Sequence, residues 1–280
     1  MTTIGLLHPG DMGSVVGACA VAAGSRVLWA SEGRSRDSRE RATAAGLQDV
    51  GGLGVVLAGS DVLISVCPPH AALDLARAVA ALRFSGLFVD ANAVSPATAR
   101  EIGATVERGG ATFVDGGLIG PPPRKAGSTR LYLSGREAKR AVGLFEGSAL
   151  EAIAVSDAPG AASALKMVYA AYTKGVSALL MGIRALAASE GVDDALLAEW
   201  HRSQPDLPKR SEAAARDNAR KAWRFVGEME EIAATFEGVG LPGGFHEAAG
   251  EIYRRLVAFK DVVDPPTMAE LVGPLTRPRT

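Results

Sequence analysis

Residues 1–36 limit the fold of this chain more than any other stretch. An apolar run at residues 3–7 leads into the loop His8-Pro9-Gly10-Asp11-Met12-Gly13, and an apolar helical pattern and a second apolar run at residues 26–30 follow. Glycines in such a loop let the backbone approach a pyrophosphate, and the next helix offers free N–H groups and the positive end of its dipole. This order is typical of a βαβ unit that binds a dinucleotide.

The glycine fingerprint of this unit departs from the standard pattern at one position. Gly10 and Gly13 fill the second and third glycine positions, whereas His8 stands at the first. An ordinary strand, turn and helix without a ligand has the same local pattern, so the loop alone does not decide between the two interpretations. We interpret His8 as a turn residue packed by the ligand, with an extended backbone because Pro9 follows it.

The end of the second apolar run indicates which dinucleotide is bound. An acidic residue at this point holds the adenosine ribose of NAD. This chain instead has Ala30 and Ser31, followed by Arg34 and Arg36, and arginines suit a 2′-phosphate. We therefore expect NADP(H) as the cofactor, with NAD(H) less favoured.

Composition and charge exclude several classes of partner. The net charge is −1, from 30 basic and 31 acidic residues, which favours neither nucleic acid nor an anionic membrane. The longest apolar run, at residues 176–188, contains Gly182 and Arg184 and falls short of the ~20 residues that span a bilayer. Only two cysteines occur, Cys19 and Cys67, and no signal-like leader precedes the first strand, so we expect a cytoplasmic protein. Its partners are then small molecules or copies of itself.

The first half of the chain alternates apolar runs with helical patterns. The apolar runs lie at residues 3–7, 26–30, 62–66, 87–90 and 112–114, and the helical patterns include residues 71–82 and 96–109. This alternation predicts an α/β Rossmann domain with a doubly wound, mostly parallel sheet. Residues 128–135 alternate like a further strand, which we expect at the edge of the sheet.

Strand-like runs almost vanish after residue 157, so the second half is predicted to be helical. A helical pattern continues from Pro159 to Glu190, and its apolar residues on several faces indicate a long interdomain helix packed between others. Further helices are expected at residues 193–202, 211–238, 244–260 and 267–273. The predicted domains are therefore residues 1–158, which bind NADP(H), and an all-α domain at residues 159–280.

Further loops follow the C-terminal ends of predicted strands, where open α/β sheets bind ligands. The loop with Val66, Cys67 and Pro68 is expected to lie along the cofactor, and packing is favoured over a nucleophilic role for Cys67. Asn92 follows the next strand, where its amide orients the nicotinamide or a substrate; the alternative is that this loop only forms an Asx turn or a helix cap by Ser95. Residues 115–123 either present backbone N–H groups to a polar substrate or form a tight crossover turn.

Lys166 is the most informative charge in the long helix. It lies about one turn inside an otherwise apolar pattern, and Tyr169, Thr173 and Lys174 share its face. A lysine in apolar surroundings is paired, reaches water or has a lowered pKa, and a lowered pKa makes it a useful proton donor. Position alone leaves open a catalytic lysine and a lysine that reaches water at a domain edge.

Together these segments resemble a known superfamily. The loop from Gly5 to Gly13, the Asp115-Gly116-Gly117 segment and the helix with Gly160 and Lys166 are similar to the β-hydroxyacid dehydrogenases, which include 3-hydroxyisobutyrate and 6-phosphogluconate dehydrogenases and the imine reductases. Residues 29–35, 65–70, 162–167 and 223–232 look more closely like the branch with a phosphogluconate dehydrogenase C-terminal-like (DUF1932) helical domain. The resemblance covers nearly the whole chain.

The resemblance implies roles for individual residues. Lys166 matches the general acid/base of the superfamily, and Arg34, with Ser31 and Ser35, matches its site for the phosphate of NADP. The helical domains of the superfamily pair two subunits around shared sites, so a homodimer through residues 159–280 is expected.

Departures from the superfamily bear on the substrate. The Ser-Gly-Gly that holds a carboxylate in hydroxyacid dehydrogenases is replaced by Ile119, Gly120 and Pro121. An asparagine pair one turn after the lysine is replaced by Tyr169 and Ala170, and a Lys-Asp pair near the nicotinamide by Gly227-Glu228. Ile119, Gly120, Tyr169 and Ala170 are the expected substrate contacts, and a simple 3-hydroxy acid is disfavoured.

The sequence therefore predicts an NADP(H)-dependent oxidoreductase that moves hydride between the nicotinamide and a small hydroxy or carbonyl compound, with Lys166 as general acid/base. Reduction of C=N bonds is the alternative, although Lys166 argues against it because imine reductases commonly replace that lysine. A non-catalytic NADP(H)-binding module is a further alternative. No metal site is expected.

Overall fold

The computed structural model describes residues 1–276 and forms two compact units, residues 1–167 and the residues from 168 onward. The boundary lies within α7 (Ala161–Ser189), whose residues belong to both units. Residues 277–280 of the predicted helical domain lie outside the described residues.

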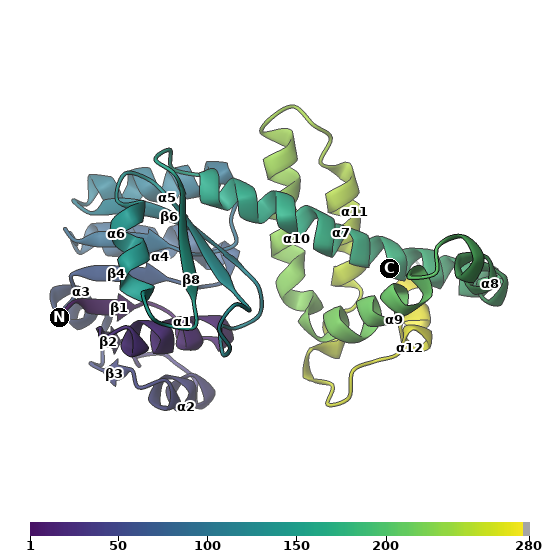
Figure 1. The fold of residues 1–280 in the computed structure, drawn as a ribbon, viewed down its shortest axis with the longest axis horizontal. Coiled ribbons are helices and arrows are strands. Elements are labelled where there is room, and N and C mark those ends of the chain that lie inside the picture. The colour runs from purple at the N-terminus through teal and green to yellow at the C-terminus, as the bar shows by residue number, and fades with distance from the viewer. Residues whose placement is uncertain (277–280) are drawn as a thin grey trace. The chain divides into compact units, whose positions relative to one another are not determined.

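The first unit is built on a sheet that, within the described residues, has eight strands (Figure 1). The strands are β1 (Thr3–Leu6), β2 (Arg26–Trp29), β3 (Gln48–Asp49), β4 (Val62–Ser65), β5 (Leu87–Asp90), β6 (Thr112–Ile119), β7 (Arg130–Ser134) and β8 (Glu151–Ser156). Their spatial order is β3-β2-β1-β4-β5-β6-β7-β8, and β6 and β7 form the antiparallel pair in an otherwise parallel sheet. The order reverses between β1 and β4, which confirms the predicted doubly wound fold.

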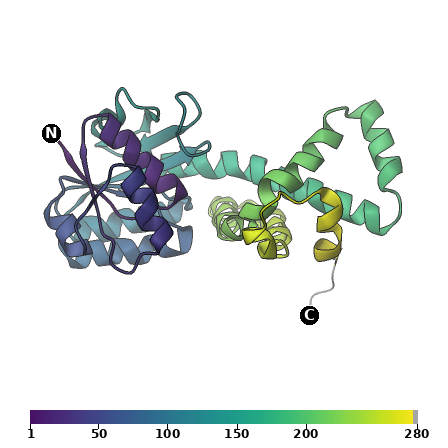
Figure 2. The same ribbon diagram turned by 90° about the horizontal axis from the view of Figure 1, so that it is seen from below.

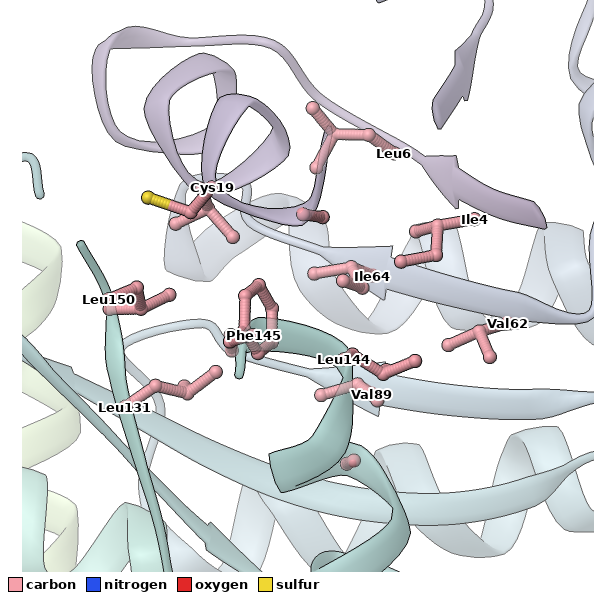
Figure 3. Packing of buried hydrophobic residues seen from close by; sticks show 14 of the residues in the cluster. Ile4, Leu6, Cys19, Val62, Ile64, Val89, Leu131, Leu144, Phe145 and Leu150 are labelled. Carbon is pink, nitrogen blue, oxygen red and sulfur yellow. The ribbon is translucent and has the colours of Figure 1, made fainter. Parts of the chain in front are cut away.

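Helices cover both faces of this sheet because the strand side chains alternate between two apolar clusters. Val62 and Ile64 pack into the cluster that contains residues of α1 (Asp11–Ala22), α2 (Arg36–Ala44) and α6 (Ala138–Val142), extended by the 3₁₀ turn η1 (Gly143–Phe145). Leu63 points to the other cluster, beneath α3 (Leu53–Ala58), α4 (Pro69–Ala81) and α5 (Pro96–Arg108). Figure 3 shows how Phe145 and Leu150 close the first cluster over the strands. Strands buried on both faces explain why the sequence shows apolar runs there.

Two strand predictions needed correction, and two strands, β3 and β8, were not predicted. The predicted edge strand at residues 128–135 is internal, because β8 pairs with β7 on its outer side. The sequence did not reveal β8 because its side chains are half-buried or exposed, without the apolar run of a buried strand. The strand predicted at residues 112–114 continues to Ile119, so Gly116 and Gly117 belong to β6 and not to a turn.

The second unit is helical, as predicted. Beyond α7 it contains α8 (Asp193–Ser203), α9 (Leu207–Asn218), α10 (Ala222–Glu237), α11 (Gly244–Arg254) and α12 (Met268–Thr276), with α10 and α11 side by side (Figures 1 and 2). The continuous helix predicted at residues 211–238 is wrong, because the 3₁₀ turn η2 (Ala219–Lys221) separates α9 from α10. The helix predicted at residues 244–260 likewise ends as α11, before a second turn, η3 (Val257–Asp261).

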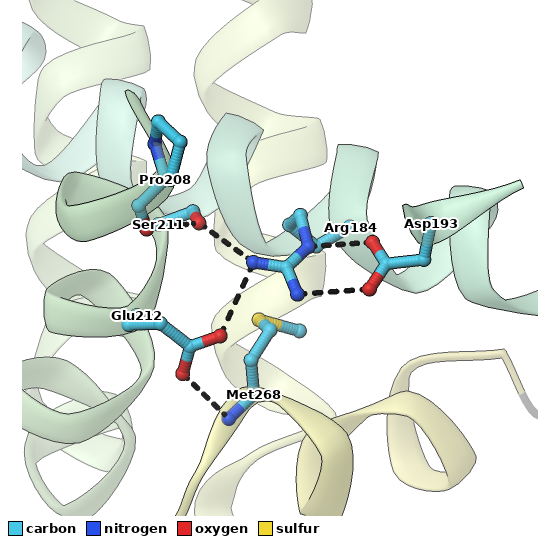
Figure 4. Close-up of polar contacts among 6 residues, drawn as sticks. All are labelled: Arg184, Asp193, Pro208, Ser211, Glu212 and Met268. Atoms are coloured by element: carbon cyan, nitrogen blue, oxygen red, sulfur yellow. Dashed lines mark hydrogen bonds and ion pairs between the residues drawn. The ribbon is translucent and has the colours of Figure 1, made fainter. Parts of the chain in front are cut away.

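A buried arginine ties four helices of this unit together (Figure 4). Arg184 of α7 donates to both carboxylate oxygens of Asp193 on α8, at 2.6 and 2.9 Å. It also donates to Ser211 and Glu212 of α9, and the second oxygen of Glu212 accepts from the backbone of Met268 in α12. The side chain of Arg184 is only 7% exposed, so this network satisfies a charge that would otherwise be costly to bury.

Among residues 1–276, no helix is long and apolar enough to cross a bilayer.

Candidate functional site

The loop between β1 and α1 forms a tight turn whose shape depends on one glycine. The backbone N–H of Gly10 donates to the carbonyl of His8 at 2.9 Å, and α1 begins one residue later. A Cβ on Gly13 would collide with the carbonyl oxygen of His8, so only glycine fits where the helix passes under the turn. No side chain caps the first turn of α1. The free N–H groups at this end suit a pyrophosphate.

His8 is bound to an arginine that the sequence had placed at the nucleotide phosphate. Nη1 of Arg34 lies 2.7 Å from Nδ1 of His8, and Nη2 donates to the carbonyl of Leu7. Because a guanidinium only donates, Nδ1 accepts and the ring proton resides on Nε2. Burial, and then the positive charges of Arg34 and Arg41, lower the pKa of His8. A neutral His8 with an Nε2–H donor therefore stands where a glycine is usual.

The two serines predicted to hold the phosphate have local partners. The carbonyl of Ser31, a buried residue, accepts from Arg39, and Ser35 caps α2 by accepting from the backbone N–H of Ser38. These contacts fix the backbone after β2. The glycine turn is instead reached by Arg34, and by Arg41 of α2, which donates to the carbonyl of Pro9.

A pocket lies beside the ends of β1 and β2. Its volume is about 100 Å³, and its walls are Leu6, Leu7, Ala30, Glu32, Arg34, Leu53, Val56 and Leu75. Apolar walls with two charged residues fit an adenosine moiety, and the pocket adjoins the glycine turn through Leu7 and Arg34. Glu32 is a lining residue that the sequence analysis missed. The signal in the sequence is an acidic residue shortly after β2, whereas the prediction sought one only at residues 30 and 31 and assigned Arg34 and Arg36 to a phosphate.

Hydrogen bonds from the side chain of Asn92 hold the loop after β4. The side-chain oxygen of Asn92 accepts from the backbone N–H of Cys67 at 2.6 Å, and its amide nitrogen donates to Ser65 at 2.9 Å and to Asp90 at 2.5 Å. Asn92 is only 2% exposed, so these partners occupy it within the protein. It holds the predicted cofactor-lining residues Val66, Cys67 and Pro68 in place.

The thiol of Cys67 is not activated. Burial, with the neighbouring Asp90 as the second cause, raises the pKa of Cys67 to about 12. The thiolate is the nucleophilic form of cysteine, and it is scarce at neutral pH when the pKa is this high. Cys67 is partly buried against the apolar cluster beneath α3, α4 and α5, which supports the packing role that the sequence favoured.

Asp90 and Asp115 are paired positions on the neighbouring strands β5 and β6, and both are fully buried. Burial, and then the charge of Asp115, raise the pKa of Asp90 to about 8. Asp115 faces three donors, the hydroxyl of Ser134 and the hydroxyl and backbone N–H of Ser163. The sequence analysis missed this cluster, which joins the sheet to the first turn of α7.

Lys166 follows one turn after Ser163 and lies against the same strand. It is partly buried, and a Cβ on Gly117 would lie 2.9 Å from the Cβ of Lys166 and 2.7 Å from the carbonyl oxygen of Ala162. The absence of a side chain at Gly117 therefore permits the close approach of α7 to β6 at the predicted catalytic lysine.

The predicted substrate contacts divide between the two units. In the first, Ile119 is buried and Gly120 has a φ of +129°, a conformation that excludes other residues beside Ser128 and Thr129. In the second, Tyr169 is half-exposed and Ala170 is buried.

The second unit also carries a partly buried ion pair, whose side chains are 13% and 15% exposed. Nζ of Lys174 lies 2.6 Å from Oε2 of Glu228 and 4.9 Å from the centre of the Phe225 ring. The hydroxyl of Tyr253 donates to the carbonyl of Lys174, which fixes the helix at this point. Among the side chains that the structure describes, no group of three or more histidine, cysteine or acidic residues has the arrangement of a metal site.

Comparisons with known proteins agree with this architecture. Residues 187–256 match the family described as a domain of unknown function, DUF1932. An uncharacterized 28.5 kDa protein from Methanothermus fervidus is 28% identical over 205 residues, which cover 72% of this chain and 79% of that protein.

Solved structures with the same fold include dehydrogenases. A conserved protein of unknown function, described as structurally similar to 3-hydroxyacid dehydrogenases, is 27% identical with a TM-score of 0.68, covering 92% of this chain and 98% of its own. The 3-hydroxyisobutyrate dehydrogenase of Mycobacterium tuberculosis, solved with L-serine, is 21% identical with a TM-score of 0.71, covering 99% and 100%. More distantly, a reductive aminase from Aspergillus terreus, solved with NADPH4, cyclohexanone and allyl amine, is 17% identical with a TM-score of 0.56, covering 97% and 98%.

Proposed function

We propose that this chain, which carries a DUF1932 domain and the fold of the β-hydroxyacid dehydrogenase superfamily, is an NADP(H)-dependent oxidoreductase acting on a small hydroxy or carbonyl compound. The observation that carries the proposal is the turn at Gly13, where a missing Cβ brings the uncapped N-terminus of α1 against the loop after β1. Such a terminus binds the pyrophosphate of a dinucleotide.

The residues around this turn fit a nicotinamide dinucleotide. The apolar pocket between β1 and β2 would take the adenosine, and Arg34 and the Nε2–H of His8 supply donors beside it. We assign Arg34 to the 2′-phosphate. On binding, its guanidinium would either leave His8 for the phosphate or contact both groups. When bound, the cofactor supplies or accepts a hydride at its nicotinamide ring.

We assign the proton transfer of the reaction to Lys166. Its Nζ would donate to the carbonyl oxygen during reduction and accept the hydroxyl proton during oxidation. The docking of α7 on Gly117 holds the backbone of this lysine close to β6. Asn92, through the backbone of Cys67, fixes the loop that would lie along the cofactor.

The cofactor assignment is tested by fluorescence titration with NADPH and NADH. We expect NADPH to bind at least tenfold more tightly, and Arg34→Met to abolish this preference while Arg140→Met, on α6, keeps it. Equal affinity for both cofactors in the unmodified protein would contradict the assignment to NADP(H). No binding of either cofactor would refute the oxidoreductase proposal.

The chemistry is tested with a panel of hydroxy acids, ketones and cyclic imines. We expect turnover of a hydroxy or carbonyl compound, and its loss in Lys166→Met with the NADPH affinity retained, whereas Lys139→Met stays active. Full activity of Lys166→Met would contradict the acid/base role. Turnover of imines alone would favour C=N reduction, and tight cofactor binding without turnover across the panel would favour a non-catalytic module.

The helical unit is proposed to form a homodimer. Val168, Tyr172, Leu179 and Leu186 of α7 are 46–62% exposed and recur at intervals of four and seven residues, which places them along one side of the helix. Exposed apolar stripes of this kind mark protein interfaces. Sedimentation should show a dimer that dissociates in the double variant Leu179→Glu/Leu186→Glu and persists in Val239→Glu, which adds charge at an exposed turn. A monomeric unmodified protein would refute the proposal.

A further inference from the structure

Side chains from the sheet accept hydrogen bonds from the backbone N–H groups at the start of α7. The backbone N–H groups of Ala162 and Ser163 belong to the first turn, where no helical carbonyl is available to them. Ala162 donates to the hydroxyl of Ser134 at 3.1 Å, and Ser163 donates to Asp115 at 3.0 Å. Both acceptors come from neighbouring strands, β7 and β6.

Asp115 makes the central contact of this junction. One carboxylate oxygen accepts from Ser134 at 2.8 Å and from the backbone of Ser163, and the other accepts from the hydroxyl of Ser163 at 2.5 Å. All three residues are fully buried, so none of these hydrogen bonds competes with water. A carboxylate at a helix N-terminus also interacts favourably with the helix dipole.

The same strand meets α7 a second time, one turn further on. Asp115 and Gly117 are two residues apart in β6 and therefore face the same side of the sheet, while Ser163 and Lys166 are three apart in α7 and share one face of the helix. Asp115 meets Ser163, and the bare backbone of Gly117 meets the Cβ of Lys166. Two contacts one helical turn apart fix both the position of the helix and its rotation about its axis.

We infer that Asp115 is a positioning residue for Lys166, acting through Ser163 to set where the lysine enters the site. This inference rests on the proposed acid/base role of Lys166. Asp90, the neighbouring carboxyl on β5, does not share this role, because its hydrogen-bond partners are Asn92 and Ser65 and not residues of α7. Loss of the Asp115 contacts should change proton transfer and leave cofactor binding intact, since the glycine turn follows β1, which β4 and β5 separate from β6.

The test compares Asp115→Asn and Ser163→Ala with Ser95→Ala, which removes a cap from α5 instead of α7. Activity is measured on the substrate found in the panel, NADPH affinity by titration, and Lys166 directly by ¹³C NMR of reductively methylated protein, its resonance being assigned with Lys166→Arg. We expect kcat to fall at least tenfold in Asp115→Asn and about threefold in Ser163→Ala. The NADPH Kd should stay within twofold, and the titration midpoint of Lys166 should move by at least half a pH unit. Ser95→Ala should change none of these beyond twofold.

The outcomes separate this inference from the proposed function. A folded Asp115→Asn with kcat within twofold and an unmoved Lys166 titration overturns the positioning role, even when Lys166→Met is inactive. Full activity of Lys166→Met instead overturns the proposed acid/base role, and the Lys166 titration then still reports whether Asp115 positions the side chain. If Asp115→Asn does not fold, the same criteria apply to Ser163→Ala, which removes only the hydroxyl contact.

Discussion

Asp90→Asn should remove a pH dependence from the stability of the first unit. Asp90 is fully buried beside Asp115, and its Oδ2 has no hydrogen-bond partner among the described residues, while Oδ1 accepts from Asn92. Burial, and then the charge of Asp115, raise the pKa of Asp90 from 3.8 to about 8. The folded protein therefore holds a proton here that the unfolded chain releases above about pH 4.

The sign and size of the effect follow from this difference. Between about pH 4 and pH 8 the folded state binds more protons than the unfolded state, so the free energy of unfolding falls as the pH rises. The slope is about 1.4 kcal/mol per pH unit, which amounts to at most about 4 kcal/mol between pH 4 and pH 7. Asparagine has the same shape and does not titrate. Asp90→Asn should match the unmodified protein near pH 4 and exceed its stability by about 2 to 4 kcal/mol at pH 7.

The measurement is urea denaturation at pH 4.5, 6 and 7.5, followed by mass-spectrometric hydrogen exchange on peptides that cover β5 and β6. These peptides report on the first unit alone, which matters because the two units need not unfold together. Asp74→Asn is the matched control, because Asp74 lies on the surface of α4, with its side chain 79% exposed. Parallel pH profiles for Asp90→Asn and the unmodified protein would refute the reasoning, since the proton would then not reside on Asp90.

Three further substitutions test contacts described above. Gly13→Ala puts a methyl group against the carbonyl of His8, so we expect at least a hundredfold weaker NADPH binding by fluorescence titration; unchanged affinity would contradict the role of the turn. Gly117→Ala forces α7 away from β6 and should cost about 2 kcal/mol in urea denaturation, with a lower kcat. Arg184→Met leaves Asp193 without its partner and should cost about 3 kcal/mol in thermal unfolding of the helical unit; an unchanged Tm would show that the network contributes specificity and not stability.

The fold could be predicted where local pattern and burial coincide. The strands β1, β2, β4 and β5 are short apolar runs because helices cover both sides of them, and their limits were found to within a residue. The prediction fails where the burial of an element is not reflected in its hydrophobic pattern. β8 is partly exposed, and the glycines of β6 look like a turn although they serve the packing of α7. The break between α9 and α10 contains neither proline nor glycine, so no residue there announces it.

The residues of the candidate site could likewise be predicted only in part. Lys166 could be singled out because a charge inside an apolar helix is visible in the sequence. The contacts of Asp115 with Ser163 span 48 residues and depend on how β6, β7 and α7 come together, so no local pattern contains them. Glu32 was missed because the acidic residue was sought closer to the end of β2 than the pocket wall extends.

The contact between His8 and Arg34 joins two departures from the usual dinucleotide-binding pattern. A histidine at the first glycine position adds a ring to a crowded turn, and an arginine after β2 adds a positive charge next to it. Together they form a hydrogen bond that requires His8 to be neutral, because a guanidinium can only donate. The second nitrogen of Arg34 donates to the carbonyl of Leu7, just after β1. The arginine therefore has a structural partner before any ligand arrives. A phosphate at this position would meet a guanidinium already oriented by the turn, which lowers the entropy cost of binding compared with a freely mobile side chain.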